Sequence, residues 1–294
     1  MTQGSNGPGG GARVRSVAIV TDSAATLPPD LAAGNRVSVV PMEVTSGGRV
    51  LGNDRLVSLE EVLRHLHDGV RTSSPSPGRF SSVIGSAQRG DGVLVLTVAR
   101  SMSSTYQAAS LAAKRSPGPV KVLDTGTAAG GEGLVVLAAA SAAAAGRSLH
   151  EVLEAARQAA AHVELVATLD DLDHLVRGGR LPRTVGRLAG LVRVQPLFEF
   201  RGGLIRPLVP AFSRRGARRR MLARWRRSRP RDRRARLHVA ALHALARDEA
   251  QWLLDAVRVE AEPVTAFVGE FDAAMVAHTG PGLTGLAWWW QVEG

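Results

Sequence analysis

The chain has 294 residues, of which 45% are hydrophobic and none is cysteine. This length suits one large domain or two ordinary ones. The lack of cysteine excludes disulfides and cysteine nucleophiles. No run approaches the roughly 18 apolar residues of a membrane span. The net charge of +11 is uneven, because fifteen arginines and one aspartate give segment 201–236 a charge of +14 and leave −3 for the remainder.

The first half of the chain predicts strands that alternate with helices. Residues 1–12 are rich in glycine and polar side chains and predict a disordered tail. Short apolar runs predict strands at 16–21, 37–44 (broken by Pro41), 92–98 and 120–123. Capping boxes at Ser58 and Ser148 open two helices, and an alanine-rich helix is predicted from Gly133 to Gly146. This alternation indicates βαβ units and a parallel sheet.

The order of elements changes after about residue 162. Strands are predicted at 165–169, 194–200, 204–209, 237–242 and 273–278, with a helix at 248–258. Gly202-Gly203 joins the second and third of these strands as a hairpin. We therefore predict a two-domain α/β fold, with an N-terminal parallel-sheet α/β domain at 13–161 and a C-terminal α+β domain with a mixed sheet at 162–294.

Polar side chains gather where four of the predicted strands end, and ligands bind at such places in open α/β sheets. The clusters are Thr21-Asp22-Ser23, residues 72–76, residues 101–105 and His278-Thr279. Hydroxyl groups dominate them, with one histidine. Any single cluster could instead cap a helix or shape a turn.

Motifs of cofactor and metal chemistry are absent or fortuitous in this sequence. The segment 280–285 fits the GxGxxG pattern, but the nine residues after it cannot form a dinucleotide-binding βαβ unit. There is no phosphate-binding loop and no nucleophile elbow. Asp170, Asp171 and Asp173 could hold a cation, although acids at the start of a helix explain them more simply. We expect no metal and no cofactor.

Eight stretches of the chain resemble the DegV family in order and spacing, from about residue 14 to the last residue. They are VAIVTDSAATLP from Val17, VVPMEV from Val39, TSSPSPGRF from Thr72, SMSSTYQAA from Ser101, VLDTGTAAGGEGL from Val122, LDDLDHLVRGGRL from Leu169, VQPLFEFRGGLIRPL from Val194 and AHTGPGLTG from Ala277. The combination of HTGPG, TSxPS and a Ser-Thr-Tyr turn is specific.

The resemblance implies a function, because studied DegV members are the fatty-acid-binding subunits of bacterial fatty acid kinase and enclose the acyl chain between two domains. It implies that Thr72, Ser103 and His278 hydrogen-bond the fatty acid carboxylate. Further pocket candidates are Asp22, Ser23, Ser73, Ser104, Thr105 and Thr279. The expected protein is cytoplasmic and is not itself an enzyme. Its ligand would be a long-chain fatty acid destined for phospholipid synthesis, and its partner an ATP-dependent fatty acid kinase.

Two positions depart from the family pattern. Ser104 stands where glycine is usual, and it would add strain if that glycine has a positive φ. Gln195 stands before Pro196 where lysine is typical.

The arginine-rich segment 214–236 supports a different hypothesis, a nucleic-acid or anionic-surface binder. Trp225 is its only aromatic residue, so base stacking would be poor and we expect no nucleic acid. Arg218, Arg219 and Arg220 could instead meet an acidic face of the kinase. A solvated, arginine-rich helix pair is the simpler explanation.

A third hypothesis is a serine hydrolase. It would use Ser23 or Ser103 as the nucleophile, with His278 as the base and Asp22 as its partner.

Overall fold

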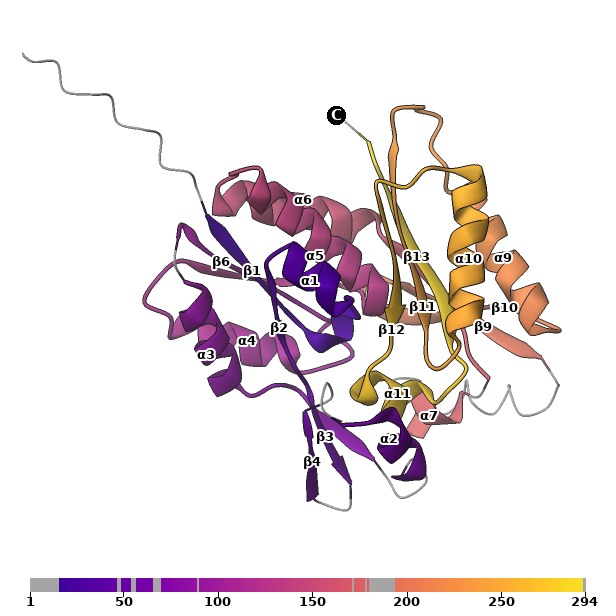
Figure 1. Ribbon diagram of the computed structural model, residues 1–294, viewed down its shortest axis with the longest axis horizontal. Helices are drawn as coiled ribbons and strands as arrows, with labels where there is room; N and C mark the ends of the chain where they lie inside the picture. The colour runs from indigo at the N-terminus through magenta and orange to yellow at the C-terminus, as the bar shows by residue number, and fades with distance from the viewer. Residues whose placement is uncertain are drawn as a thin grey trace, which may run out of the picture.

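The computed structural model describes residues 16–46, 49–53, 57–65, 70–88, 90–170, 172–177, 179 and 194–292. The predicted tail at 1–12 and Asp171 lie outside these residues. Figure 1 shows the indigo and magenta N-terminal elements beside the orange and yellow C-terminal ones, with a small third sheet below them. The fold is α/β, with an N-terminal parallel-sheet domain and a C-terminal domain with a mixed sheet, as predicted.

The first sheet contains four parallel strands in the order β2-β1-β6-β7. They are β1 (Val17–Asp22), β2 (Val37–Val40), β6 (Gly92–Thr97) and β7 (Val120–Asp124). All four were predicted from short apolar runs. Pro41 follows β2 directly, and proline has no N–H with which to continue a strand ladder.

Helices cover both faces of this sheet. On one face, α3 (Pro77–Ala87) and α4 (Thr105–Lys114) pack against side chains that include Val93 and Val95. On the other, α5 (Ala129–Ala144) and α6 (Leu149–His162) pack against Leu94 and Leu96. Every residue of β6 is buried, because successive side chains of a strand point to opposite faces and both faces are covered.

The second sheet has six strands in the order β10-β9-β8-β13-β11-β12, and of the described pairs only β11–β12 is parallel. They are β8 (Glu164–Thr168), β9 (Gln195–Arg201), β10 (Leu204–Ala211), β11 (Arg236–His243), β12 (Thr265–Glu270) and β13 (Thr284–Gln291). The β9–β10 hairpin was predicted, and Gly202 and Gly203 have the positive φ of its turn, 58° and 79°. Helices α9 (Arg214–Arg227) and α10 (Arg247–Glu260) cover one face.

Helix α5 lies between the two sheets and joins their cores. It packs against β1 of the first sheet and against β11 and β13 of the second, and most of its residues are buried. It begins at Ala129, four residues before the predicted Gly133. A Cβ on Gly130 would lie 2.5 Å from Leu242, so close approach of the sheet requires glycine here despite its poor helix propensity.

A small antiparallel sheet in the order β4-β3-β5 projects from the N-terminal domain. Its strands are β3 (Glu43–Ser46), β4 (Arg49–Asn53) and β5 (Arg71–Ser73). Strand β5 was not predicted, and its pairing with β3 sets Thr72 opposite Val44. Helix α2 (Leu59–His65) begins at the predicted cap, where the Glu61 N–H donates to Ser58 Oγ at 3.1 Å.

Residues 273–278 form a helix, so the predicted strand is wrong there. Helix α11 (Ala273–Thr279) has Asp272 as its N-cap, whose carboxylate accepts the Met275 N–H at 3.1 Å. Its C-cap is Gly280, with φ 66°. A run of five apolar residues before His278 fits either a strand or a buried helix, and the Asp272 cap and Gly280 decide for the helix. The neighbouring strands β12 and β13 were not predicted. The described residues also form the short helices η1 (Ser23–Ala25), α1 (Pro29–Gly34) and α7 (Asp173–Arg177).

Candidate functional site

Thr72, Ser103 and His278 line one cavity of about 610 Å³. They come from β5, from the loop between β6 and α4, and from the last turn of α11. Thr72 Oγ1 lies 2.6 Å from His278 Nε2. The three residues expected at a carboxylate site therefore share one cavity, with contributions from both domains.

A cluster of hydroxyl groups surrounds Ser103. Ser103 Oγ lies 2.8 Å from Ser74 Oγ and 2.8 Å from Thr105 Oγ1. Ser74 Oγ lies 2.9 Å from Ser104 Oγ, and the Thr105 N–H donates to Ser103 Oγ at 3.3 Å. Sequence reasoning did not single out Ser74, although it lies within the polar stretch 72–76. Its partners belong to another loop, so no spacing along the chain identifies it.

The serine at position 104 adds no backbone strain. Ser104 has φ −78° and ψ 8°, which any L-residue adopts easily. The departure from glycine therefore leaves the turn intact and adds a hydroxyl group to the cluster.

Apolar side chains form much of the remaining wall of this cavity. They belong to Met42, Val98, Met102, Ala128, Leu175 and Met275. A cavity that combines an apolar wall with a few convergent polar groups suits a largely apolar ligand with a polar head.

Ser73 and Thr279 line the same cavity, but their hydroxyl groups bond within the protein. Ser73 Oγ donates to Glu43 at 3.4 Å, and Thr279 Oγ1 donates to the Met275 carbonyl at 3.1 Å. Both therefore contribute to the shape of the cavity.

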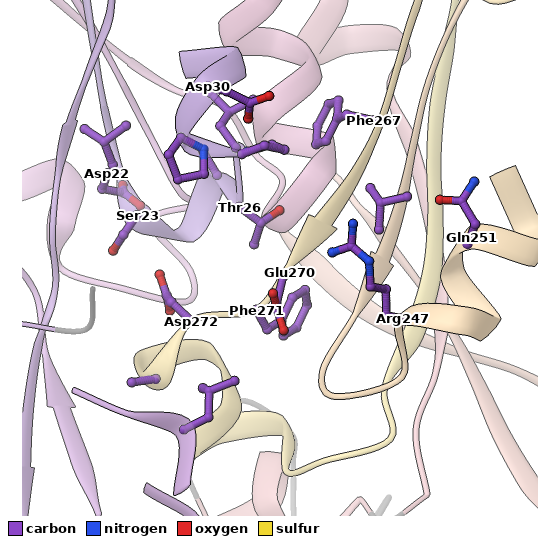
Figure 2. A pocket seen from close by; sticks show the side chains of 18 of the residues that line it. Asp22, Ser23, Thr26, Asp30, Arg247, Gln251, Phe267, Glu270, Phe271 and Asp272 are labelled. Carbon is purple, nitrogen blue, oxygen red and sulfur yellow. The ribbon is translucent and has the colours of Figure 1, made fainter. Parts of the chain in front are cut away.

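Asp22 and Ser23 line a second cavity of about 730 Å³, shown in Figure 2. The Asp22 carboxylate accepts the N–H groups of Ala24 and Val98, each at 3.0 Å, and Ser23 Oγ accepts the Met42 N–H at 3.1 Å. These bonds hold the turn that follows β1. The structure therefore does not bring Asp22 and Ser23 into the cavity of Ser103 and His278.

The second cavity has a mixed charge. In Figure 2, Asp22 and Ser23 lie on one side, while Arg247 and Gln251 of α10 lie on the other, with Glu270 between them. Charged side chains of both signs therefore line this cavity, together with the hydroxyl residues Ser23 and Thr26.

Glu132 is a buried carboxyl group that sequence reasoning missed. It lies in the first turn of α5, and its Oε1 accepts the Thr21 hydroxyl at 3.1 Å, while Oε2 has no hydrogen-bond partner among the described residues. Burial raises the pKa of Glu132 well above its ordinary value, and the charges of Asp22 and Asp124 raise it further, against the Thr21 bond that lowers it.

Three of the fifteen arginines of segment 201–236 pair with acidic side chains of described neighbouring elements. The pairs include Arg214 with Asp170 and Glu249, Arg224 with Glu164 and Glu199, and Arg226 with Glu260. The segment contains one helix, α9, in place of the predicted helix pair, and its Met221 and Trp225 are buried. The charge of the segment is therefore partly neutralised, and one side of α9 belongs to the core.

Arg218, Arg219 and Arg220 differ in their surroundings. The Arg218 guanidinium lies 4.8 Å from the centre of the Trp252 ring, a cation–π contact. Arg220 Nη1 donates to the Val209 carbonyl at 2.7 Å. Arg219 is exposed and makes no ion pair or hydrogen bond with any described residue. Of the three, Arg219 has the guanidinium most available to a partner.

The described part of the chain contains no helix with the length and hydrophobicity that a bilayer span requires. Nor does it contain a group of three or more histidine, aspartate or glutamate side chains placed to hold a metal ion, and Asp170 pairs with Arg214 instead.

Comparison with known proteins identifies the family. The family model described as "DegV: Uncharacterised protein, DegV family" matches residues 16–290. A DegV domain-containing protein of Streptomyces coelicolor is 36% identical over 279 residues, which cover 92% of this chain and 98% of that protein.

Solved structures agree with this assignment. A DegV family protein from Thermus thermophilus, described for its fatty acid binding, has 30% identity and a TM-score of 0.84, with 93% of this chain and 99% of that one covered. A Thermotoga maritima protein, described as revealing a fatty acid binding function, has 25% identity and a TM-score of 0.80, with 94% and 99% covered. The chain therefore belongs to the DegV family.

Proposed function

We propose that the protein binds one long-chain fatty acid, with the carboxylate beside Thr72, Ser103 and His278 and the acyl chain against the apolar wall. The convergence of these three side chains in one apolar-walled cavity carries the proposal. Burial of the acyl chain contributes about 0.8 kcal/mol of binding free energy per CH₂. The desolvated carboxylate, in contrast, requires hydrogen-bond donors. The fatty acid binding of the Thermus and Thermotoga relatives supports this ligand class.

The other candidate residues have supporting roles in this proposal. Ser73, Ser104 and Thr279 lie around the carboxylate, and Thr105 holds Ser103. Asp22 and Ser23 support the turn that separates the two cavities.

The protein would present its ligand to an ATP-dependent fatty acid kinase in the cytoplasm, as the family resemblance implies. Acyl-phosphate formation requires groups that hold ATP, and the sequence has no phosphate-binding loop. Phosphoryl transfer would belong to the kinase, and this chain would act as a binding protein without a cofactor.

The contact with the kinase would use the exposed arginines of α9. Arg215 and Arg219 are four residues apart, so they share one side of the helix, and both are exposed without an ion pair to any described residue. Arg218 and Arg220 carry charge on the same helix but also bind Trp252 and Val209. A basic stripe of this kind attracts an acidic protein surface.

The geometry favours binding over the hydrolase hypothesis. Ser103 hydrogen-bonds to Ser74 and Thr105 rather than to His278, and the Asp22 carboxylate accepts two backbone N–H groups in the interior. A fluorophosphonate probe is expected to label no serine.

Native mass spectrometry of the protein purified from bacteria tests the proposed function. We expect a co-purified mass that matches a long-chain fatty acid and disappears when the protein is denatured. Protein that carries no such mass, and that takes up no added palmitic acid, would contradict the proposal.

A further inference from the structure

Three serine hydroxyl groups form a continuous chain between two loops. Ser104 Oγ lies 2.9 Å from Ser74 Oγ, which lies 2.8 Å from Ser103 Oγ. Ser74 precedes α3, whereas Ser103 and Ser104 precede α4. Ser104 is exposed, and Ser74 and Ser103 are half-buried. This series of hydrogen-bonded hydroxyl groups therefore leads from the surface to the Ser103 hydroxyl, which the proposed function places against the carboxylate.

The directions of the three O–H bonds are linked. A hydroxyl group donates one proton and accepts through two lone pairs. If Ser103 donates its proton to a ligand carboxylate, it must accept from Ser74 at their 2.8 Å contact. Ser74 has then used its proton, so it must accept from Ser104 at 2.9 Å. The second lone pair of Ser103 then accepts from Thr105, whose hydroxyl lies at 2.8 Å and whose N–H shares that lone pair at 3.3 Å, so the Ser103 proton stays free for the ligand.

We propose that Ser74 is a positioning residue, which turns the Ser103 hydroxyl toward the ligand carboxylate, and that Ser104 supports Ser74 in the same way. This inference rests on the proposed function. Aligned hydroxyl groups polarise one another, so the last donor in the chain is stronger than an isolated one. A glycine at position 104 would remove the outermost donor. The chain of three serines is therefore a feature of carboxylate recognition.

A double-mutant cycle tests the role of Ser74, with the dissociation constant for palmitic acid measured by calorimetry. Ser74→Ala should weaken binding roughly two- to tenfold, the effect of one lost hydrogen bond. In the Ser103→Ala background the same change should have no effect, because Ser74 acts through Ser103. Ser104→Gly should weaken binding less than Ser74→Ala. Ser82→Ala, on the exposed side of α3, is the matched control and should bind normally.

A second ligand separates positioning from a structural defect. Methyl palmitate has the same acyl chain without a carboxylate charge, so Ser74→Ala should weaken its binding much less than that of palmitic acid. Equal weakening for both ligands, or equal weakening with and without Ser103, would overturn the inference.

The same measurements distinguish failure of the inference from failure of the proposed function. Normal palmitic acid binding by Ser74→Ala, together with weakened binding by Ser103→Ala, overturns only the role of Ser74. Absence of palmitic acid binding by the unaltered protein overturns both.

Discussion

Thr72 and His278 are separated by 206 positions in the sequence, and Thr72 Oγ1 nevertheless lies 2.6 Å from His278 Nε2. Thr72 is held by the pairing of β5 with β3, and His278 lies in the last turn of α11. The contact joins the small N-terminal sheet to a helix of the C-terminal half. A ligand head bound beside this pair would therefore contact both halves of the protein.

Removal of a head-group donor should weaken fatty acid binding. Ser103→Ala and His278→Ala should each reduce the affinity for palmitic acid more than tenfold, because a hydrogen bond to a charged group contributes about 1.5–3 kcal/mol. Calorimetry measures the affinity, and an unchanged melting temperature shows that the fold is intact. Unaltered affinity in both variants would exclude these residues from the site.

Charge reversal on the exposed side of α9 should impair the kinase reaction alone. Arg215→Glu with Arg219→Glu should slow acyl-phosphate formation by roughly tenfold at low salt and leave palmitic acid affinity unchanged, because electrostatic steering raises association rates. The difference should shrink as salt rises, since the Debye length is about 8 Å at physiological ionic strength. Equal kinase rates at all salt concentrations would show that this side of α9 is only solvated.

Arg218→Glu should behave differently from its exposed neighbours. Arg218 lies over Trp252, so its reversal removes a cation–π contact and should lower the free energy of unfolding by about 1 kcal/mol. Chemical denaturation of Arg218→Glu and Arg219→Glu side by side measures this, and equal stability of the two variants would contradict it.

The buried Glu132 should make stability depend on pH. The folded-state pKa of Glu132 is raised above the ordinary value of 4.5. The contribution of protonated Glu132 to the free energy of unfolding is therefore fully present below pH 4.5 and is lost as pH rises through the folded-state pKa. Relative to Glu132→Gln, the unaltered protein should lose up to about 1.4 kcal/mol of unfolding free energy per pH unit within this window. Denaturation curves of both proteins, measured at a series of pH values that starts below 4.5 and rises through neutrality, give the difference. A difference that does not change with pH would contradict a raised pKa.

Close packing of α5 against the second sheet should make Gly130 intolerant of a side chain. The added Cβ of Gly130→Ala would lie 2.5 Å from Leu242 Cδ2 and 2.7 Å from Ala240 Cβ, so the free energy of unfolding should fall by about 1–3 kcal/mol. Gly85→Ala in α3 is the matched control, because nothing lies within 4 Å of its added Cβ, and it should stabilise the protein by about 0.5–1 kcal/mol. Equal effects of the two substitutions would contradict the packing argument.

Local signals in the sequence determined the elements that depend on neighbouring residues. The capping box at Ser148 and the double glycine at 202–203 were sufficient for a helix start and a hairpin, because their hydrogen bonds and φ angles are local. The central strands β1 and β6 of the first sheet were visible because they are largely buried on both faces and therefore have nearly continuous apolar sequences. The family motifs added Thr72, Ser103 and His278, and the domain limits 13–161 and 162–294 stay a prediction that separate expression of the two segments would test.

Tertiary structure decided the features that depend on distant partners. Helix α5 extended through its glycines because a second sheet packs against them. Ser74 belongs to the candidate carboxylate site because its loop contacts the loop of Ser103. Asp22 and Ser23 line the second cavity instead. In each case the deciding hydrogen bond or van der Waals contact is made with a residue far away in the sequence. Composition and spacing predicted the helix caps, the family motifs and a part of the strands, whereas the packing of the two domains decided which polar side chains share a cavity.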